Sequence, residues 1–105
     1  MNSRDKRFVC FYWSILKYFG LNPSEGLLAL LIYGLSRKEG YCHASKKYLS
    51  NMMNVSEATI FSLINKLIRN GLIIRDGFSE YKTSCYKPSE KFSEYIKILK
   101  EVNTD

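Results

Sequence analysis

The sequence has no long hydrophobic run and no recognisable export signal. Its longest apolar run, Leu27–Tyr33, has seven residues, far fewer than the roughly 20 that are needed to cross a bilayer. The N-terminus also lacks the apolar stretch and small-residue cleavage site of a secretory signal. We therefore expect a cytoplasmic protein that does not cross a membrane.

Cysteine and histidine are both scarce. The three cysteines, Cys10, Cys42 and Cys85, are widely spaced, and this odd number favours reduced, buried thiols over a disulfide framework. His43 is the only histidine, and no C-x-x-C pair accompanies it, so no metal site is predicted. Paired carboxylates, a G-x-S-x-G turn and a phosphate-binding glycine loop are also lacking, which predicts a protein without enzymatic activity or cofactor.

Hydrophobic residues make up 46% of the 105 residues, and charged residues make up 25%. This composition predicts one small domain over residues 1–105 with a single core, and it excludes a multidomain enzyme. Sixteen Lys and Arg against ten Asp and Glu give a formal net charge of +6. Such an excess favours polyanionic partners without identifying one.

The first 21 residues allow two interpretations. The aromatic and β-branched run Phe8–Tyr12 predicts a strand, followed by a short helix over Trp13–Phe19. The alternative is a single helix over Arg4–Phe19, because the apolar residues of this segment also share one helical face.

Residues 22–71 carry the start and stop signals of three helices. Asn22 caps a helix over Pro23–Leu35, which is apolar almost all round and therefore central. A basic loop over Arg37–His43 leads to Ser45, which caps a short helix from Lys46 to about Met52. This short helix is predicted to turn these residues inward: Tyr48, Leu49 and either Met52 or Met53.

A tight turn separates the second and third of these helices. Asn54 tolerates the left-handed backbone conformation that such a turn needs, and Val55 fills its corner. Ser56 caps the next helix, which runs to about Asn70 and ends at Gly71. The predicted core face of this helix consists of Ile60, Leu63, Ile64 and Leu67.

The rest of the chain predicts a hairpin over residues 72–86 and a last helix over residues 89–101. Leu72–Arg75 and Tyr81–Tyr86 are the predicted strands, with a turn at Asp76-Gly77. Ser89 caps the helix, whose apolar stripe consists of Phe92, Tyr95, Ile96 and Leu99. This stripe either packs on its own domain or forms the interface of a homodimer.

Helix, tight turn, helix and hairpin follow one another in the order of a winged helix-turn-helix. Residues 45–73 also carry a pattern of small, aliphatic and capping residues: Ser45, Leu49, Ser50, Asn54, Val55, Ser56, Thr59, Ile60, Ile64, Leu67, Gly71, Leu72 and Ile73. This pattern resembles the winged-helix domains of bacterial, phage and plasmid regulators and replication proteins. The resemblance implies a mainly α fold with a small β-hairpin, with the helix-turn-helix at residues 45–70 and one additional C-terminal helix.

The resemblance also implies that Ser56–Arg69 is a recognition helix that enters the major groove of double-stranded DNA. With its apolar face inward, Ser62 and Asn65 face base edges and Phe61 faces a thymine methyl group. Phosphate contacts are expected from Lys66 and Arg69, from Ser56 and Thr59 at the start of the helix, and from the basic residues of the flanking elements: Lys46, Lys47, Arg75 and Lys82. The complete set of predicted DNA-binding residues is Lys46, Lys47, Ser56, Ala58, Thr59, Phe61, Ser62, Asn65, Lys66, Arg69, Arg75 and Lys82.

The sequence thus predicts a DNA-binding protein of transcriptional control or of replication of a phage or plasmid. One feature favours a different function. The leading face of the predicted recognition helix carries Glu57, Ala58, Phe61 and Ser62, so it has an aromatic residue and little positive charge. Exposed aromatics are commoner at protein interfaces than elsewhere on a surface. The alternative is therefore a winged-helix module that binds a host protein.

Overall fold

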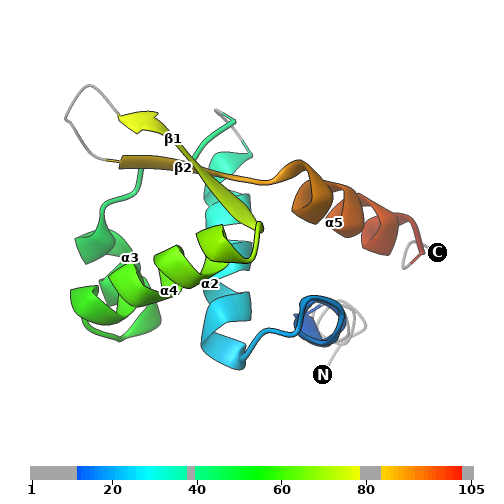
Figure 1. The fold of residues 1–105 in the computed structure, drawn as a ribbon, viewed down its shortest axis with the longest axis horizontal. Coiled ribbons are helices and arrows are strands. Elements are labelled where there is room, and N and C mark those ends of the chain that lie inside the picture. The colour runs from blue at the N-terminus through cyan, green and yellow to red at the C-terminus, as the bar shows by residue number, and fades with distance from the viewer. Residues whose placement is uncertain (1–11, 38–39, 79–83, 103–105) are drawn as a thin grey trace.

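The computed structural model describes residues 12–37, 40–78 and 84–102. A helix over residues 12–19 is followed by α2 (Pro23–Ser36), α3 (Lys46–Met53) and α4 (Glu57–Arg69). The strands β1 (Ile73–Phe78) and β2 (Ser84–Pro88) come next, and α5 (Glu90–Val102) is last. α3 and α4 lie toward one end of the long axis, together with the last part of β1 and the first part of β2, and α5 lies at the other end (Figure 1). The predicted mainly α fold with a small β-hairpin is confirmed.

α2 is the central helix, as its apolar composition predicts. The side chain of Asn22 accepts a hydrogen bond of 2.9 Å from the backbone N–H of Glu25, and the Glu25 carboxylate accepts one of 2.8 Å from the N–H of Asn22. This reciprocal pair satisfies two backbone donors that the start of a helix otherwise leaves without a partner. α2 then packs against both β2 and α4. None of the helices in the described ranges is both long and apolar enough to span a bilayer.

The hairpin differs from its prediction at Asp76-Gly77. Both residues lie inside β1, where the antiparallel register shifts between Arg75, which pairs with Tyr86, and Phe78, which pairs with Ser84. One extra residue on β1 therefore forms a bulge, and Gly77 has the positive φ of 76° that such a bulge favours. The predicted turn at Asp76-Gly77 is therefore wrong. A glycine with positive φ occurs in tight turns and in β-bulges alike, and here it belongs to a bulge. The predicted strand residues Tyr81–Thr83 lie outside the described residues.

The first segment is helical where it is described. Tyr12 belongs to the helix over residues 12–19, so the predicted strand is wrong at this residue, and Phe8–Phe11 lie outside the described residues. The Tyr12 hydroxyl donates a hydrogen bond of 2.5 Å to the backbone oxygen of Pro23, which ties this helix to the start of α2. Gly26 of α2 allows the close packing here, because a Cβ atom would overlap Leu16 Cδ2.

The apolar stripe of α5 packs on its own domain. Phe92 and Ile96 are fully buried in the core, and Tyr95 and Leu99 are partly buried against it. The Tyr95 ring stacks on Tyr18, with 4.1 Å between the ring centroids. Phe92 and Ile96 therefore offer no surface to a second copy, and their assignment to a dimer interface is wrong in this arrangement.

In α3 the core-facing residues are Leu49 and Met53, since Leu49 is buried and Met53 packs against the core. Tyr48 and Met52 are exposed, so the prediction that Tyr48 turns inward is wrong. Consecutive residues differ by about 100° around a helix, and placing Leu49 at the centre of the buried face moves Tyr48 to its margin.

We predict that replacing Leu67 costs much more stability than replacing an exposed residue of similar size. Leu67 is 0% exposed in the core, whereas Ile98 of α5 is 55% exposed. Leu67→Ala should lower the free energy of unfolding by about 2–5 kcal/mol through loss of burial and a residual cavity. The control Ile98→Ala should change it by less than about 0.5 kcal/mol. Urea denaturation checks both values, and equal losses in the two variants would contradict the packing.

Candidate nucleic-acid interface

The turn between α3 and α4 sets how α4 leaves the core. Asn54 adopts the left-handed conformation, with φ 58° and ψ 46°, and the N–H of Val55 donates to the backbone oxygen of Ser50 over 3.0 Å. Asparagine has a short polar side chain that is not branched at Cβ, so it enters this conformation at lower cost than most residues except glycine. The prediction for Asn54 is confirmed, and α4 begins two residues after the turn.

Ser56 caps α4 as predicted. Its hydroxyl oxygen accepts a hydrogen bond of 3.1 Å from the N–H of Thr59 and lies 2.9 Å from the Thr59 hydroxyl. The other N–H groups of the first turn point along the helix axis, where the positive end of the helix dipole favours an anion. Ser56 and Thr59 are both exposed, so this end of α4 is open to a ligand.

α4 divides into a buried face and an exposed face. Ile60, Ile64 and Leu67 are fully buried, at the spacing that places residues on one side of a helix. The opposite side carries the predicted DNA-facing residues, among which Asn65 is half-buried and the others are exposed: Ala58, Phe61, Ser62, Asn65, Lys66 and Arg69. α4 therefore turns its apolar face toward the core and the predicted DNA-facing residues toward solvent, as the sequence predicts.

Phe61 is the most unusual side chain on this face because it is aromatic and 51% exposed. The ammonium of Lys46, at the start of α3, lies 5.7 Å from the centroid of its ring. A cation at this distance is attracted to the negative face of the ring. Phe61 and Lys46 thus form one surface feature that joins α3 to α4.

Lys66 has a structural role that the sequence did not reveal. Its ammonium lies 2.6 Å from the Glu25 carboxylate, and the Glu25 side chain is only 2% exposed. Burial alone would raise the pKa of Glu25, but the hydrogen bond and charge of Lys66, together with the Asn22 N–H, lower it below its ordinary value. Lys66 was predicted to contact phosphate. In the structure its ammonium, which is half exposed, neutralises a buried carboxylate of α2.

The remaining predicted cations surround α4 on neighbouring elements. Lys47 of α3, Arg69 at the end of α4 and Arg75 of β1 are exposed, and the Arg75 guanidinium carbon lies 5.9 Å from the centroid of the Tyr86 ring. Lys47 and Arg69 make no ion pair with another residue in the described ranges. Lys82 lies outside those ranges, so its predicted place on the wing has no structural counterpart here.

Two contacts near α4 join residues that are distant in sequence. Glu25 stands three residues after Asn22, which is the spacing of a capping box. This spacing could have indicated the hydrogen bond between the Glu25 carboxylate and the Asn22 N–H, but not the ion pair between Glu25 and Lys66. The Lys91 ammonium donates a hydrogen bond of 3.1 Å to the backbone oxygen of Asn70. Lysine at this position satisfies a carbonyl at the negative end of α4, and no local pattern pointed to it.

The described residues include few groups that suit catalysis. Cys42 and Cys85 are buried thiols, as predicted, and Cys10 lies outside the described residues. Burial raises the pKa of the Cys42 thiol, which keeps it protonated and unreactive at neutral pH. Within the described ranges, no group of three or more His, Cys, Asp and Glu residues could hold a metal ion.

We predict that Lys66→Ala destabilises the protein in a pH-dependent way. At neutral pH the substitution leaves the Glu25 carboxylate buried without its cation, at a cost of about 1–3 kcal/mol. The pKa of Glu25 is lowered in the folded state, so its stabilising contribution is complete above the pKa of unfolded glutamate and is lost as the pH falls through the folded value. The difference between wild type and Lys66→Ala should therefore shrink as the pH falls below about 4.3.

Urea denaturation at several pH values measures this difference. The double variant Glu25→Gln/Lys66→Ala serves as the control, because it removes the carboxylate as well as its partner. A gap between Lys66→Ala and wild type that is the same at pH 7 and pH 3 would contradict the ion pair.

Comparisons with known proteins agree with this geometry. The sequence model of a family described as a helix-turn-helix domain matches residues 20–73, more than half of the chain, and these residues contain α2, α3, α4 and the start of β1. Comparison with curated proteins found no match.

Solved structures with the same fold include two of AbfR and one of HlyU. AbfR of Staphylococcus epidermidis superposes with a TM-score of 0.58 at 18% identity, over 92% of this chain and 62% of that one. Its disulfide-containing form gives 0.60 at 18% identity, over 92% and 63%. Reduced HlyU from Vibrio cholerae gives 0.58 at 15% identity, over 99% and 100%.

The present chain thus spans about 63% of the length of the AbfR chain that it matches. At these identities the superpositions establish the fold alone. Together with the family match and the α2–α4 geometry, they show that the chain belongs to the helix-turn-helix domain family and has the winged form of that fold.

Proposed function

We propose that this protein is a non-enzymatic DNA-binding protein that inserts α4 into the major groove of double-stranded DNA and acts in transcriptional control. The observation that carries the proposal is the division of α4 into a fully buried apolar face and an exposed face on which polar and charged residues surround Phe61. A major groove about 12 Å wide admits one α-helix. An exposed helix beside a two-stranded wing is the arrangement that such docking requires.

Base contacts in this proposal come from the middle of α4. Ser62 is exposed and Asn65 is half-buried, and both side chains can donate and accept hydrogen bonds. Asparagine forms a bidentate contact with adenine, while an apolar side chain such as Phe61 or Ala58 contacts a thymine methyl group. These residues would therefore specify sequence, in contrast to the charged residues around them.

Phosphate contacts in this proposal come from the ends of α4 and from its neighbours. Arg69, Lys47 and Arg75 are exposed on three elements, and the open first turn at Ser56 and Thr59 supplies backbone N–H groups. Lys46 and Lys82 complete the set. Lys66 belongs to it only in part, because its ammonium already neutralises Glu25. The net charge of +6 supports binding to a polyanion.

The proposal also covers the cellular setting of the protein and its oligomeric state. The setting that we propose is a small regulator in the cytoplasm, although a DNA-binding subunit in replication of a phage or plasmid would use the same face of α4. A homodimer would match a palindromic site. Because Phe92 and Ile96 are buried, such a dimer would need other residues, including the exposed parts of Tyr95 and Leu99.

A second function is favoured by Phe61. This ring is 51% exposed beside Lys46, and the N-terminal half of α4 also carries the acidic Glu57. Aromatic side chains at the centre of a surface patch often dominate protein–protein binding. The same face of α4 would then bind a host protein. In that case, duplex DNA would bind negligibly at physiological salt, and Phe61→Ala would abolish binding of the protein partner.

We predict that Arg69→Ala weakens binding to all duplexes alike. Loss of one phosphate contact should reduce the slope of log affinity against log salt concentration by about 0.9. Gel shifts with pooled random duplexes at several ionic strengths measure this slope. Lys17→Ala is the matched control, because Lys17 is exposed on the helix over residues 12–19 and removal of its charge should leave the slope unchanged. Equal slopes for wild type and Arg69→Ala would contradict the phosphate contact.

A further inference from the structure

The outer face of α4 has a chemical character that favours one kind of base pair. Ala58, Phe61, Ser62 and Asn65 follow one another along this face, and none of them is charged. At a rise of about 1.5 Å per residue, the stretch from Ala58 to Asn65 covers about 10 Å, or about three steps of stacked base pairs. A helix that lies along the groove therefore presents two apolar and two hydrogen-bonding side chains to a few consecutive base pairs.

The Phe61 ring matches thymine better than it matches the other bases. Thymine alone presents a methyl group in the major groove, whereas cytosine presents an amino donor and guanine presents two acceptors. The ring is 51% exposed, so contact with a methyl group removes apolar surface from water on both sides. An amino or carbonyl group against the ring would lose water without gaining a partner. Ala58, three residues earlier on the same face, has the same preference.

Ser62 and Asn65 provide the hydrogen-bonding groups of this face. Neither side chain is hydrogen bonded to another residue in the described ranges. The asparagine amide matches adenine, which offers one acceptor and one donor, and it does not match guanine, which offers two acceptors. Asn65 lies about 6 Å beyond Phe61 along the axis and about 40° from it around the helix. An adenine about two base-pair steps from the thymine would therefore meet the Asn65 amide.

Guanine is read most often by arginine or lysine, and the cations of α4 are not placed to do this. The Lys66 ammonium lies 2.6 Å from the buried Glu25 carboxylate, and Lys66 is about 140° around the helix from Phe61. Moving this ammonium to a guanine would leave the carboxylate buried without its cation, which is costly. Arg69 lies about 10 Å beyond Ser62 along the axis, away from the N-terminal half that contacts base edges in this docking mode.

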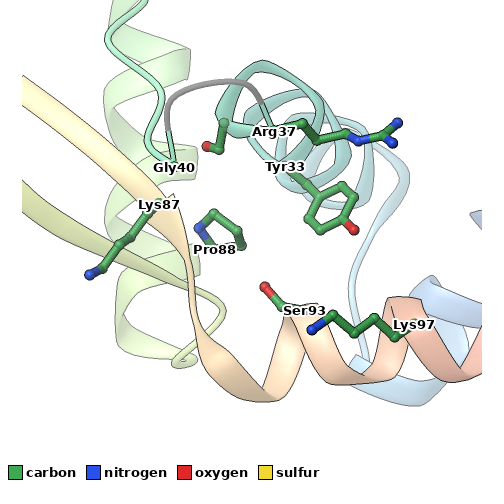
Figure 2. A pocket seen from close by; sticks show the side chains of 8 residues that line it. Tyr33, Arg37, Gly40, Lys87, Pro88, Ser93 and Lys97 are labelled. Carbon is green, nitrogen blue, oxygen red and sulfur yellow. The ribbon is translucent and has the colours of Figure 1, made fainter.

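Other cations of the chain belong to elements that do not enter the groove in this docking mode. The Lys46 ammonium lies 5.7 Å from the centroid of the Phe61 ring, but Lys46 is on α3, the helix that crosses the phosphate backbone. Arg37, Lys87 and Lys97 line a pocket of about 390 Å³ between the end of α2, β2 and α5 (Figure 2). These three residues add to the net charge without adding a guanine-reading side chain to α4.

We infer that α4 selects A·T base pairs, with Phe61 against a thymine methyl group and Asn65 bonded to an adenine about two steps away. This inference rests on the proposed function, because it names the class of duplex that the same face of α4 binds. Glu57 agrees with it: this carboxylate stands in the first turn of α4, where it repels the two acceptors of a guanine edge.

Selection from a pool of random duplexes with the full chain tests the preference. The expected result is enrichment of sequences that share a core of A·T pairs with both thymine and adenine on the strand edges that face α4. A core of G·C pairs would overturn the inference but leave the proposed function standing, because duplex DNA would still be bound. Failure to retain any duplex, even at low salt, would contradict the proposed function and the inference together.

Thymine contact is tested with deoxyuridine, which lacks only the methyl group, at each thymine of a selected duplex in turn. At one position the replacement should weaken wild-type binding by about fourfold. Phe61→Ala should bind the two duplexes equally, as expected when one partner of a contact is already absent. Phe61→Leu keeps an apolar side chain and should retain part of the difference. A fourfold difference that persists in Phe61→Ala would overturn the assignment of the thymine to Phe61.

Adenine contact is tested with 7-deazaadenine, which lacks the N7 acceptor. At one adenine it should weaken wild-type binding by about threefold to tenfold, and this loss should vanish in Asn65→Ala but persist in Phe61→Ala. Lys17→Ala, which changes an exposed residue of the helix over residues 12–19, should leave the effects of both analogues unchanged. If A·T cores are enriched but neither analogue weakens binding, the shape of the DNA accounts for the preference and the inference is wrong.

Discussion

The arrangement of this molecule depends on the burial of one face of α4 against the central helix α2. Ile60, Ile64 and Leu67 hold that face in the core, and the ion pair between Lys66 and the buried Glu25 fixes α4 to α2 at its side. A buried carboxylate without a partner is costly, so the pair limits how far α4 can rotate or slide. The turn at Asn54 then determines the direction in which α4 leaves α3. Together these constraints give α4 a defined outer face.

The same constraint explains an unusual distribution of charge. A recognition helix often gains affinity from its own basic residues, but here Lys66 is engaged with Glu25 and the leading turn carries Glu57. Nonspecific attraction to phosphate would therefore come from Lys47, Arg69 and Arg75 on the surrounding elements. The middle of α4 is left with small polar residues and Phe61. Such a face suits discrimination between base edges better than strong general attraction.

Sequence patterns predicted the parts of the fold that local chemistry determines. The caps at Asn22, Ser45 and Ser56 and the left-handed Asn54 depend on residues within one helical turn, and all four have the predicted role. The pair Glu25–Lys66 joins residues far apart in the chain, so no local spacing could indicate it. Gly77 shows a different limit, because a positive φ is required equally by a turn and by a bulge. The stripe of α5 likewise revealed an apolar face but not which surface covers it.

The claim that the outer face of α4 enters a duplex is tested most directly by NMR titration of the ¹⁵N-labelled protein with double-stranded DNA at physiological ionic strength. The account predicts that the largest amide shifts fall in residues 56–65 and in the described part of the hairpin. Amides of the helix over residues 12–19 and of α5 should change little. Large shifts confined to those two helices, with the amides of α4 unchanged, would contradict it.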